Sequence, residues 1–192
     1  MREQSPDSGA QKLAQSPTTF RETYNPLSAI VIPCHSSENR RYVPIGFIDN
    51  SKIVTNAVLF IPDATLYHFG VLTSNVHMAW MRAVCGRLEM RYRYSANIVY
   101  NNFPWCDPTP EQKAKIEQTA QAILDARALY PDCSLADLYD EVTMPPELRR
   151  AHQANDKAVM QAYGFWGKLN TETACVAELM KMYQELTGKE KR

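Results

Sequence analysis

The sequence predicts an α+β fold, with antiparallel strands and one helix in its N-terminal half and a bundle of about three helices in its C-terminal half. Short β-branched and aromatic runs, broken by proline, asparagine and serine, fill the chain up to about residue 107. Such runs are typical of strands and loops. From residue 108 onward, the chain carries helix caps followed by apolar residues at helical spacing. We therefore expect one unit over residues 1–107 and a helical domain over residues 108–192.

Three strands are expected early in the chain, at Ala29–Ile32, Val43–Ile48 and Ala57–Ile61. Each is rich in the residue types that favour extended structure. The turn-type cluster Asp49-Asn50-Ser51 follows the second strand. Antiparallel pairing of neighbouring strands is the simplest arrangement. Residues 1–20 are polar, and we expect them to be loosely ordered.

A helix is expected from Ser74 to about Cys85, because serine is a good N-cap and Gly86 stands where a helix would end. The stretch Arg87–Tyr94 then alternates strictly between charged and apolar residues. This alternation predicts a single strand with one charged and one buried face. The charged face would hold Arg87, Glu89, Arg91 and Arg93, and the buried face would hold Leu88, Met90, Tyr92 and Tyr94.

Residues that favour the start of a helix occur at several points in the second half of the chain. The segment Thr109-Pro110-Glu111-Gln112 combines an N-cap, a proline at the first helical position and a capping-box glutamine. Further starts are expected at Ser134, at Pro145-Pro146 and at Thr171, with ends near Tyr139, Tyr163 and Gly188.

The composition excludes several classes of protein. Lys plus Arg number 21 and Asp plus Glu number 21, so the whole chain has no basic excess that would indicate a nucleic-acid partner. The longest apolar run, Ala57–Ile61, is far shorter than the roughly 20 residues of a membrane-spanning helix, and no signal peptide is apparent. The five cysteines form no C-x-x-C pair, which is typical of reduced thiols. We expect a cytoplasmic protein without a membrane segment.

No catalytic motif is apparent. Neither a dinucleotide-binding nor a phosphate-binding glycine motif occurs, and there is no G-x-S-x-G elbow. The tetrapeptide Asn102-Phe103-Pro104-Trp105 resembles the Asn-Pro-Pro-aromatic loop of amino-methylating DNA methyltransferases, but Phe103 replaces the first proline, so we interpret it as a hinge. Cys34 and His35 would diverge along a strand rather than converge on zinc. We therefore expect no catalytic residue, metal site or cofactor site in this chain.

The most informative cluster lies at residues 82–93, where four arginines surround one glutamate. A carboxylate accepts a hydrogen bond from cytosine N4, and an arginine donates to guanine O6 and N7. Glu89 and Arg91, about 6.6 Å apart along a strand, would thus read the two bases of one C·G pair. The DNA backbone would be contacted by Arg40, Arg41, Arg82, Arg87 and Arg93. The same spacing equally suits a solvated strand face whose charges pair with a neighbouring strand.

Longer segments of the chain resemble the MmeI-like (type IIL) restriction-modification enzymes, single chains that join nuclease, adenine methyltransferase and target recognition. These segments are His35–Phe47 (HSSENRRYVPIGF), Ala64–Leu72 (ATLYHFGVL), Trp80–Leu88, Tyr92–Trp105, Leu135–Asp140 and Met144–His152 (MPPELRRAH). The resemblance extends from about Lys12 to about Thr187. One departure is Cys106, where the family commonly has proline.

The resemblance implies that the chain is the C-terminal portion of such an enzyme. Residues 1–107 would be the DNA target-recognition domain, or most of it, and residues 108–192 the C-terminal helical domain. The partners would be double-stranded DNA and an upstream adenine-specific methyltransferase domain of the same chain. That upstream domain would bind S-adenosylmethionine, and some relatives also cut DNA.

The resemblance also implies a role for two residues. In the family, a Glu and an Arg two residues apart after Gly-Arg-Leu go with C at an outer position of the recognition sequence, whereas Lys and Asp there go with G. Glu89 and Arg91 match the first version. The alternative is a structural or protein-interaction module without direct DNA reading, suggested by the neutral net charge.

Overall fold

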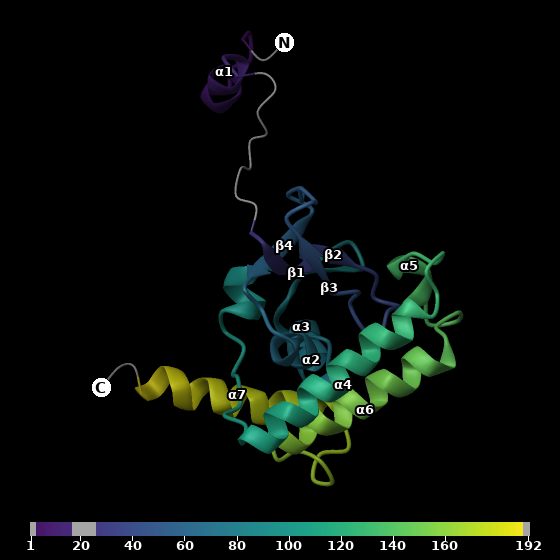
Figure 1. Cartoon of the computed structure of the whole chain (residues 1–192). Helices are drawn as coiled ribbons and strands as arrows, with labels where there is room; N and C mark the ends of the chain where they lie inside the picture. The colour runs from purple at the N-terminus through teal and green to yellow at the C-terminus, as the bar shows by residue number, and fades with distance from the viewer. Residues whose placement is uncertain (1–2, 17–25, 190–192) are drawn as a thin grey trace.

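The protein is described by a computed structural model that covers residues 3–16 and 26–189. The α+β class is confirmed: antiparallel sheets lie in the N-terminal half and several helices follow. In Figure 1 the sheets lie at the top, helices α2 (Leu66–Leu72) and α3 (Asn75–Val84) in the middle, and the C-terminal helices below. Within the described ranges, no helix is long and apolar enough to cross a membrane.

The first sheet has β1 (Ser28–Pro33) at its centre, with β3 (Gly46–Asp49) and β4 (Val58–Pro62) on either side. Both pairings are antiparallel. The expected pairing of β3 with its neighbour in sequence, β4, is wrong, because β1 lies between them. The expected strand over Val43–Ile48 begins only at Gly46, since Pro44 has no N–H to donate and the N–H of Ile45 donates to the carbonyl of Val43 (2.9 Å).

The second sheet joins three short strands in the order β2 (His35–Ser36), β6 (Arg91–Arg93) and β5 (Gly86–Leu88). It is tied to the first sheet through Cys34. The N–H of Cys34 donates to the carbonyl of Ala57, and its carbonyl accepts from the N–H of Tyr94, both at 2.9 Å. The strand expected over Arg87–Tyr94 is therefore wrong, and a hairpin replaces it.

The helices of the first half are more numerous than expected. Helix α3 is confirmed, and the Ser74 hydroxyl accepts from the N–H of His77 at its start. Helix α2 was not expected, and neither was α1 (Ser8–Ala14), which is capped by the Asp7 carboxylate. The start that was expected to be loosely ordered therefore contains this short helix, which has no buried side chain, and residues 17–20 lie outside the described ranges. A single π-helical turn, η1 (Ala96–Tyr100), precedes the second half.

The second half contains α4 (Pro110–Ala128), α5 (Leu135–Leu138), α6 (Pro146–Ala162) and α7 (Glu172–Lys189). The capping box at Thr109 and the helix start at Ser134 are confirmed. The end of α6 is also confirmed, with Gly164 at φ +68° just beyond it. Helix α7 is described to Lys189, one residue beyond the end expected near Gly188.

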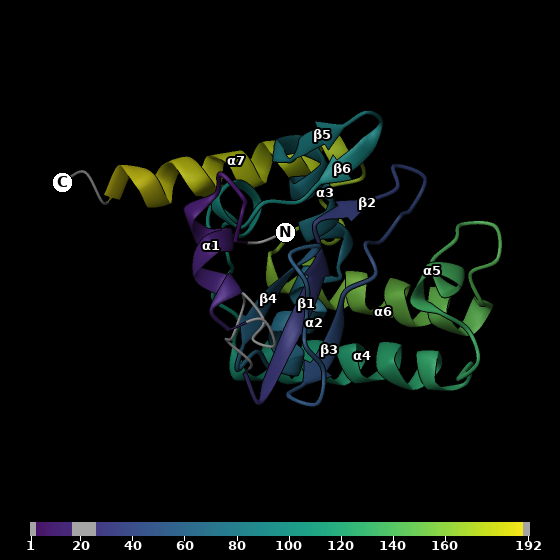
Figure 2. The ribbon, with the colours of Figure 1, turned by 90° about the horizontal axis from the view of Figure 1, so that it is seen from above.

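One hydrophobic core extends through both halves of the chain. Helices α4 and α6 run side by side, α2 packs on α4, and α7 packs on α3 (Figures 1 and 2). The core joins side chains from the two halves, including Phe69, Leu72, Trp80, Ile116, Ile123 and Leu148. The sequence boundary near residue 107 is therefore not a boundary in packing.

The two halves approach each other closely at Gly70 in α2. A Cβ at this position would lie 2.6 Å from Cγ2 of Ile116 and 3.2 Å from Cβ of Ala120, both on α4. Asn155 of α6 also contacts this position, because its side-chain amide donates to the Gly70 carbonyl (2.7 Å). Only glycine allows α2 to lie this close to α4.

Candidate nucleic-acid interface

The candidate interface is the hairpin formed by β5 and β6. Leu88 pairs with Arg91 and Arg87 pairs with Tyr92, so the turn contains only Glu89 and Met90. Glu89 has φ +55°, a left-handed backbone that residues with a Cβ rarely adopt. This two-residue turn breaks the alternation that a continuous strand would carry. The hairpin lies above α3 and α7 in Figure 2.

The two faces of the hairpin follow from its register. Cross-strand partners share a face, which places Arg91 and Arg93 on one face and Arg87 with Tyr92 on the other. The expectation that Arg87, Arg91 and Arg93 share a face is therefore wrong. Burial of Tyr92 and Tyr94 is confirmed, whereas the expected burial of Leu88 and Met90 is wrong, because both are exposed at the tip.

Glu89 and Arg91 nevertheless lie together at this tip. A guanidinium nitrogen of Arg91 is 3.2 Å from a carboxylate oxygen of Glu89, and the side chains are 52% and 78% exposed. An ion pair this exposed contributes at most about 1 kcal/mol to folding. The two groups are therefore accessible to a partner and can exchange their mutual contact for contacts with it.

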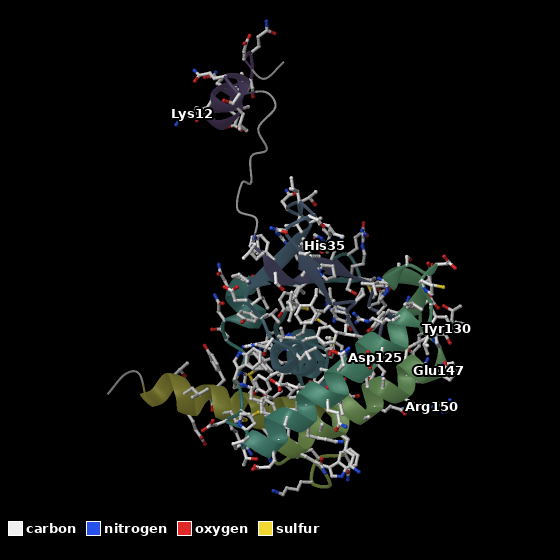
Figure 3. All side chains as sticks on the ribbon, viewed as in Figure 1. Lys12, His35, Asp125, Tyr130, Glu147 and Arg150 are labelled. Carbon is white, nitrogen blue, oxygen red and sulfur yellow. The ribbon has the colours of Figure 1, made fainter. Side chains whose placement is uncertain are left out.

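Arg87 makes its contacts within the hairpin. Its guanidinium lies over the ring of Tyr92, 4.1 Å from the centroid, and one nitrogen donates to the carbonyl of Met90 (3.1 Å). The face that carries Arg91 and Arg93 is the outer face. There, Arg93 of β6 pairs in register with His35 of β2, and both are exposed. Figure 3 shows His35 on the sheet side of the molecule, away from Tyr130, Glu147 and Arg150.

Arg82 connects three parts of the fold. It forms two hydrogen bonds with the carboxylate of Glu172 in α7, at 2.7 and 2.8 Å, and donates to the carbonyl of Arg41 at 3.1 Å. Arg41 is exposed, Arg40 is half-buried, and both lie in the loop after β2. This loop borders a cavity of about 670 Å³ whose charged lining is Glu38, Arg40, Arg41, Arg82, Glu141 and Glu172.

A buried polar network fixes this loop to the C-terminal half. The hydroxyl of Tyr42 donates to the carboxylate of Asp156 in α6 (2.7 Å), and the other oxygen of that carboxylate accepts from the N–H of Asn75 at the start of α3 (2.8 Å). Arg41 donates to the Tyr42 hydroxyl (3.2 Å). Burial raises the pKa of Asp156 to about 6. The position of the loop that carries Arg40 and Arg41, here called the arginine loop, thus depends on α6.

Two buried histidines lie in similar surroundings. Nε2 of His152 is 2.7 Å from the hydroxyl of Tyr139, and Nε2 of His77 is 2.9 Å from the hydroxyl of Tyr94. Burial lowers the pKa of both histidines, to about 3 for His77. Both are therefore neutral packing residues. In the ranges that the structure covers, no three His, Cys, Asp or Glu side chains come together to hold a metal ion.

Sequence reasoning missed the network at Asp156. The spacing in α6 contained a signal for it, because His152, Asn155 and Asp156 lie on the same helical face as the apolar Leu148 and Val159. All of these side chains are buried. Polar residues on an apolar helix face indicate buried hydrogen bonds to another element.

Comparisons with known proteins place the chain in a family. Residues 1–107 match the family model described as MmeI, target recognition domain, and residues 108–189 match the one described as MmeI, C-terminal domain. DNA methyltransferase A of Bacillus subtilis (strain 168) is 41% identical over 187 residues, which cover 97% of this chain and 21% of that protein. This chain therefore spans about a fifth of the curated relative's length.

A solved structure of the type IIL restriction-modification enzyme MmeI in complex with DNA is similar in fold and sequence. It is 49% identical to this chain with a TM-score of 0.91, and the match covers 97% of this chain and 25% of that one. Two family models that together reach from residue 1 to residue 189, and a solved relative of the same fold, agree. The chain belongs to the MmeI family.

Proposed function

We propose that this chain recognises a specific sequence in double-stranded DNA and positions it for an upstream adenine-specific methyltransferase domain. The proposal rests on one observation above all. The hairpin of a chain that matches a target recognition domain ends in an exposed carboxylate and an exposed guanidinium, 3.2 Å apart. Glu89 would accept from cytosine N4, and Arg91 would donate to guanine O6 and N7.

The shape of the hairpin supports this assignment. A two-stranded ribbon fits the major groove, where each base pair presents a distinct set of donors and acceptors. The tip carries no buried side chain, so it can enter a groove without disturbing the core. Each correct contact would contribute about 1–3 kcal/mol of discrimination.

Phosphate contacts are proposed for Arg40, Arg41 and Arg93. The first two lie in a loop beside the second sheet, and Arg93 lies on its outer face. Arg82 and Arg87 were expected to act in the same way, but terminal guanidinium nitrogens of both donate to groups of the protein itself. Arg41, in contrast, donates to Tyr42 through its Nε. We assign Arg82 to holding the loop against α7.

We also propose that the whole enzyme is an S-adenosylmethionine-dependent methyltransferase of the cytoplasm, which in this family is sometimes joined to a nuclease. The free state of all five cysteines supports a reducing compartment. The residues of this chain do not fit the cofactor, because it has no glycine-rich loop of the required composition. Cofactor binding is therefore assigned to the upstream domain.

A titration of labelled duplex DNA at several salt concentrations tests the proposed function. We expect binding that weakens steeply with salt, because phosphate contacts release counterions. Absence of binding at low salt would favour the alternative, a structural or protein-interaction module.

Addition of S-adenosylmethionine should leave the isolated chain unaffected. Its seven glycines include no G-x-G pair, so no backbone turn is available for close approach to the cofactor. We expect no heat of binding in calorimetry and no methylation of DNA. Micromolar binding of the cofactor would contradict the assignment to an upstream domain.

Arg40→Ala or Arg41→Ala should weaken DNA binding across all sequences and reduce the salt slope by about 1, because phosphate contacts carry no sequence information. Arg150→Ala is the matched control, since it removes the same charge from α6, away from the sheet side marked by His35 in Figure 3. Equal affinity of all three variants and the wild type at low salt would show that the loop arginines are only solvated charges.

A further inference from the structure

We propose that Arg87 is a positioning residue for base recognition: it holds the turn that presents Glu89 and Arg91 and does not bind phosphate. This inference rests on the proposed function, because it concerns how the same hairpin reads DNA. It assigns to Arg87 a role different from that of the other arginines of the cluster.

The turn needs support from outside its own two residues. Glycine is the residue normally found at a first turn position with positive φ. Here that position is Glu89, with φ +55°. Neither Glu89 nor Met90 is a residue that favours such turns. Both side chains are exposed, so packing of the tip does not stabilise the conformation either.

Arg87 supplies the support through two contacts. It donates to the carbonyl of Met90, the second turn residue, and its guanidinium carbon lies over the ring of Tyr92, 4.1 Å from the centroid. Tyr92 is only 7% exposed and belongs to the hydrophobic core. Arg87 therefore connects the backbone of the turn to the core on the face opposite Arg91 and Arg93.

Only arginine makes both contacts together. The planar guanidinium stacks on an aromatic ring while a nitrogen at its edge donates in the same plane. A lysine ammonium keeps the charge but has no plane to stack and no fixed donor geometry. Arg87→Lys therefore separates the two roles, because phosphate attraction survives the change and support of the turn does not.

The consequence for recognition is specific. Without its support, the turn exchanges between backbone conformations, and Glu89 and Arg91 no longer face one base pair together. Discrimination at that base pair falls, whereas attraction to the phosphates is retained because the charged groups remain on the hairpin.

The experiment measures two quantities for each variant with a pool of duplexes randomised in sequence. One is the salt slope of total binding, and the other is the base preference of the bound fraction at each position. Arg87→Lys should keep the wild-type slope and lose about tenfold in preference at one position, the position that Glu89→Gln also affects. Arg150→Lys is the control, because it makes the same change in α6, away from the sheet side of the molecule in Figure 3, and should leave that preference intact.

Two results would overturn the inference. Unchanged preference at that position in Arg87→Lys would exclude a positioning role. A slope reduced by about 1 in Arg87→Gln, with preference unchanged, would identify Arg87 as a phosphate contact. Failure of the proposed function looks different, since the wild type would then select no sequence and Glu89→Gln would change nothing.

Discussion

Replacing Glu89 with lysine and Arg91 with aspartate in the full-length enzyme is expected to change the preferred base at one site position from C to G. The exchange reverses donor and acceptor at the hairpin tip. Lysine then donates to guanine, and aspartate accepts from the cytosine of the opposite strand. The two side chains also keep opposite charges, so the ion pair seen between Glu89 and Arg91 is retained in reverse. Mapping the methylated sequence measures the result.

The two single changes serve as controls for this exchange. Glu89→Lys brings two cations together, and Arg91→Asp brings two carboxylates together, where the present groups are 3.2 Å apart. Each should mainly lose activity, at about 1–3 kcal/mol per disrupted contact. An active double variant with an unchanged base at every position would defeat the recognition role. A purely structural role of the pair would instead appear as a loss of folding stability without any change of specificity.

Gly70→Ala is expected to lower the free energy of unfolding by about 1–3 kcal/mol, the usual cost of overpacking a core. The added Cβ would lie 2.6 Å from Ile116 and 3.1 Å from Oδ1 of Asn155. Asn155 cannot easily yield, because it is hydrogen-bonded to the Gly70 carbonyl and to Thr119. Chemical denaturation monitored by circular dichroism measures the change.

The sign of this effect is diagnostic. Replacing glycine by alanine within a helix ordinarily stabilises by up to about 1 kcal/mol. Gly188→Ala in α7 tests that expectation, because nothing lies within 4 Å of the position. It should be neutral or slightly stabilising. If Gly70→Ala behaved in the same way, α2 and α4 would not be packed as closely as described.

The parts of the fold that were predicted correctly depend on local chemistry. Thr109, Ser134 and Ser74 cap helices through hydrogen bonds to residues three positions along the chain. The strand cores of β1 and β4 depend on β-branched composition in the same local way. Such features are encoded within a few residues and can be read without knowing the rest of the structure.

The hairpin was missed because nothing in its turn interrupts the pattern. Glu89 and Met90 are not turn-favouring residues, and the alternation of charged and apolar types continues through them. Its pairing with β2 depends on tertiary structure. Helix α2 was missed for a related reason, because a short helix with Gly70 at its middle is stabilised by packing on α4.

The candidate site was predicted in part. The proximity of Glu89 and Arg91 follows from their spacing, although the backbone that achieves it is a turn. The arginine loop is held by the hydrogen bond from Tyr42 to Asp156, two residues more than a hundred positions apart in the chain. A contact of that kind depends on how α6 is placed against α3, which local patterns do not specify.

The separation between a shared core and an exposed hairpin tip bears on how such enzymes acquire new targets. Residues 88–91 contribute no buried side chain. Substitutions there should therefore leave the folding stability above the minimum that selection requires. Recombination that joins residues 1–107 of one relative to the helices of another would instead divide the packing around Gly70 and Trp80. New target specificities are thus expected to arise more readily by point substitution at the tip than by exchange of residues 1–107 between relatives.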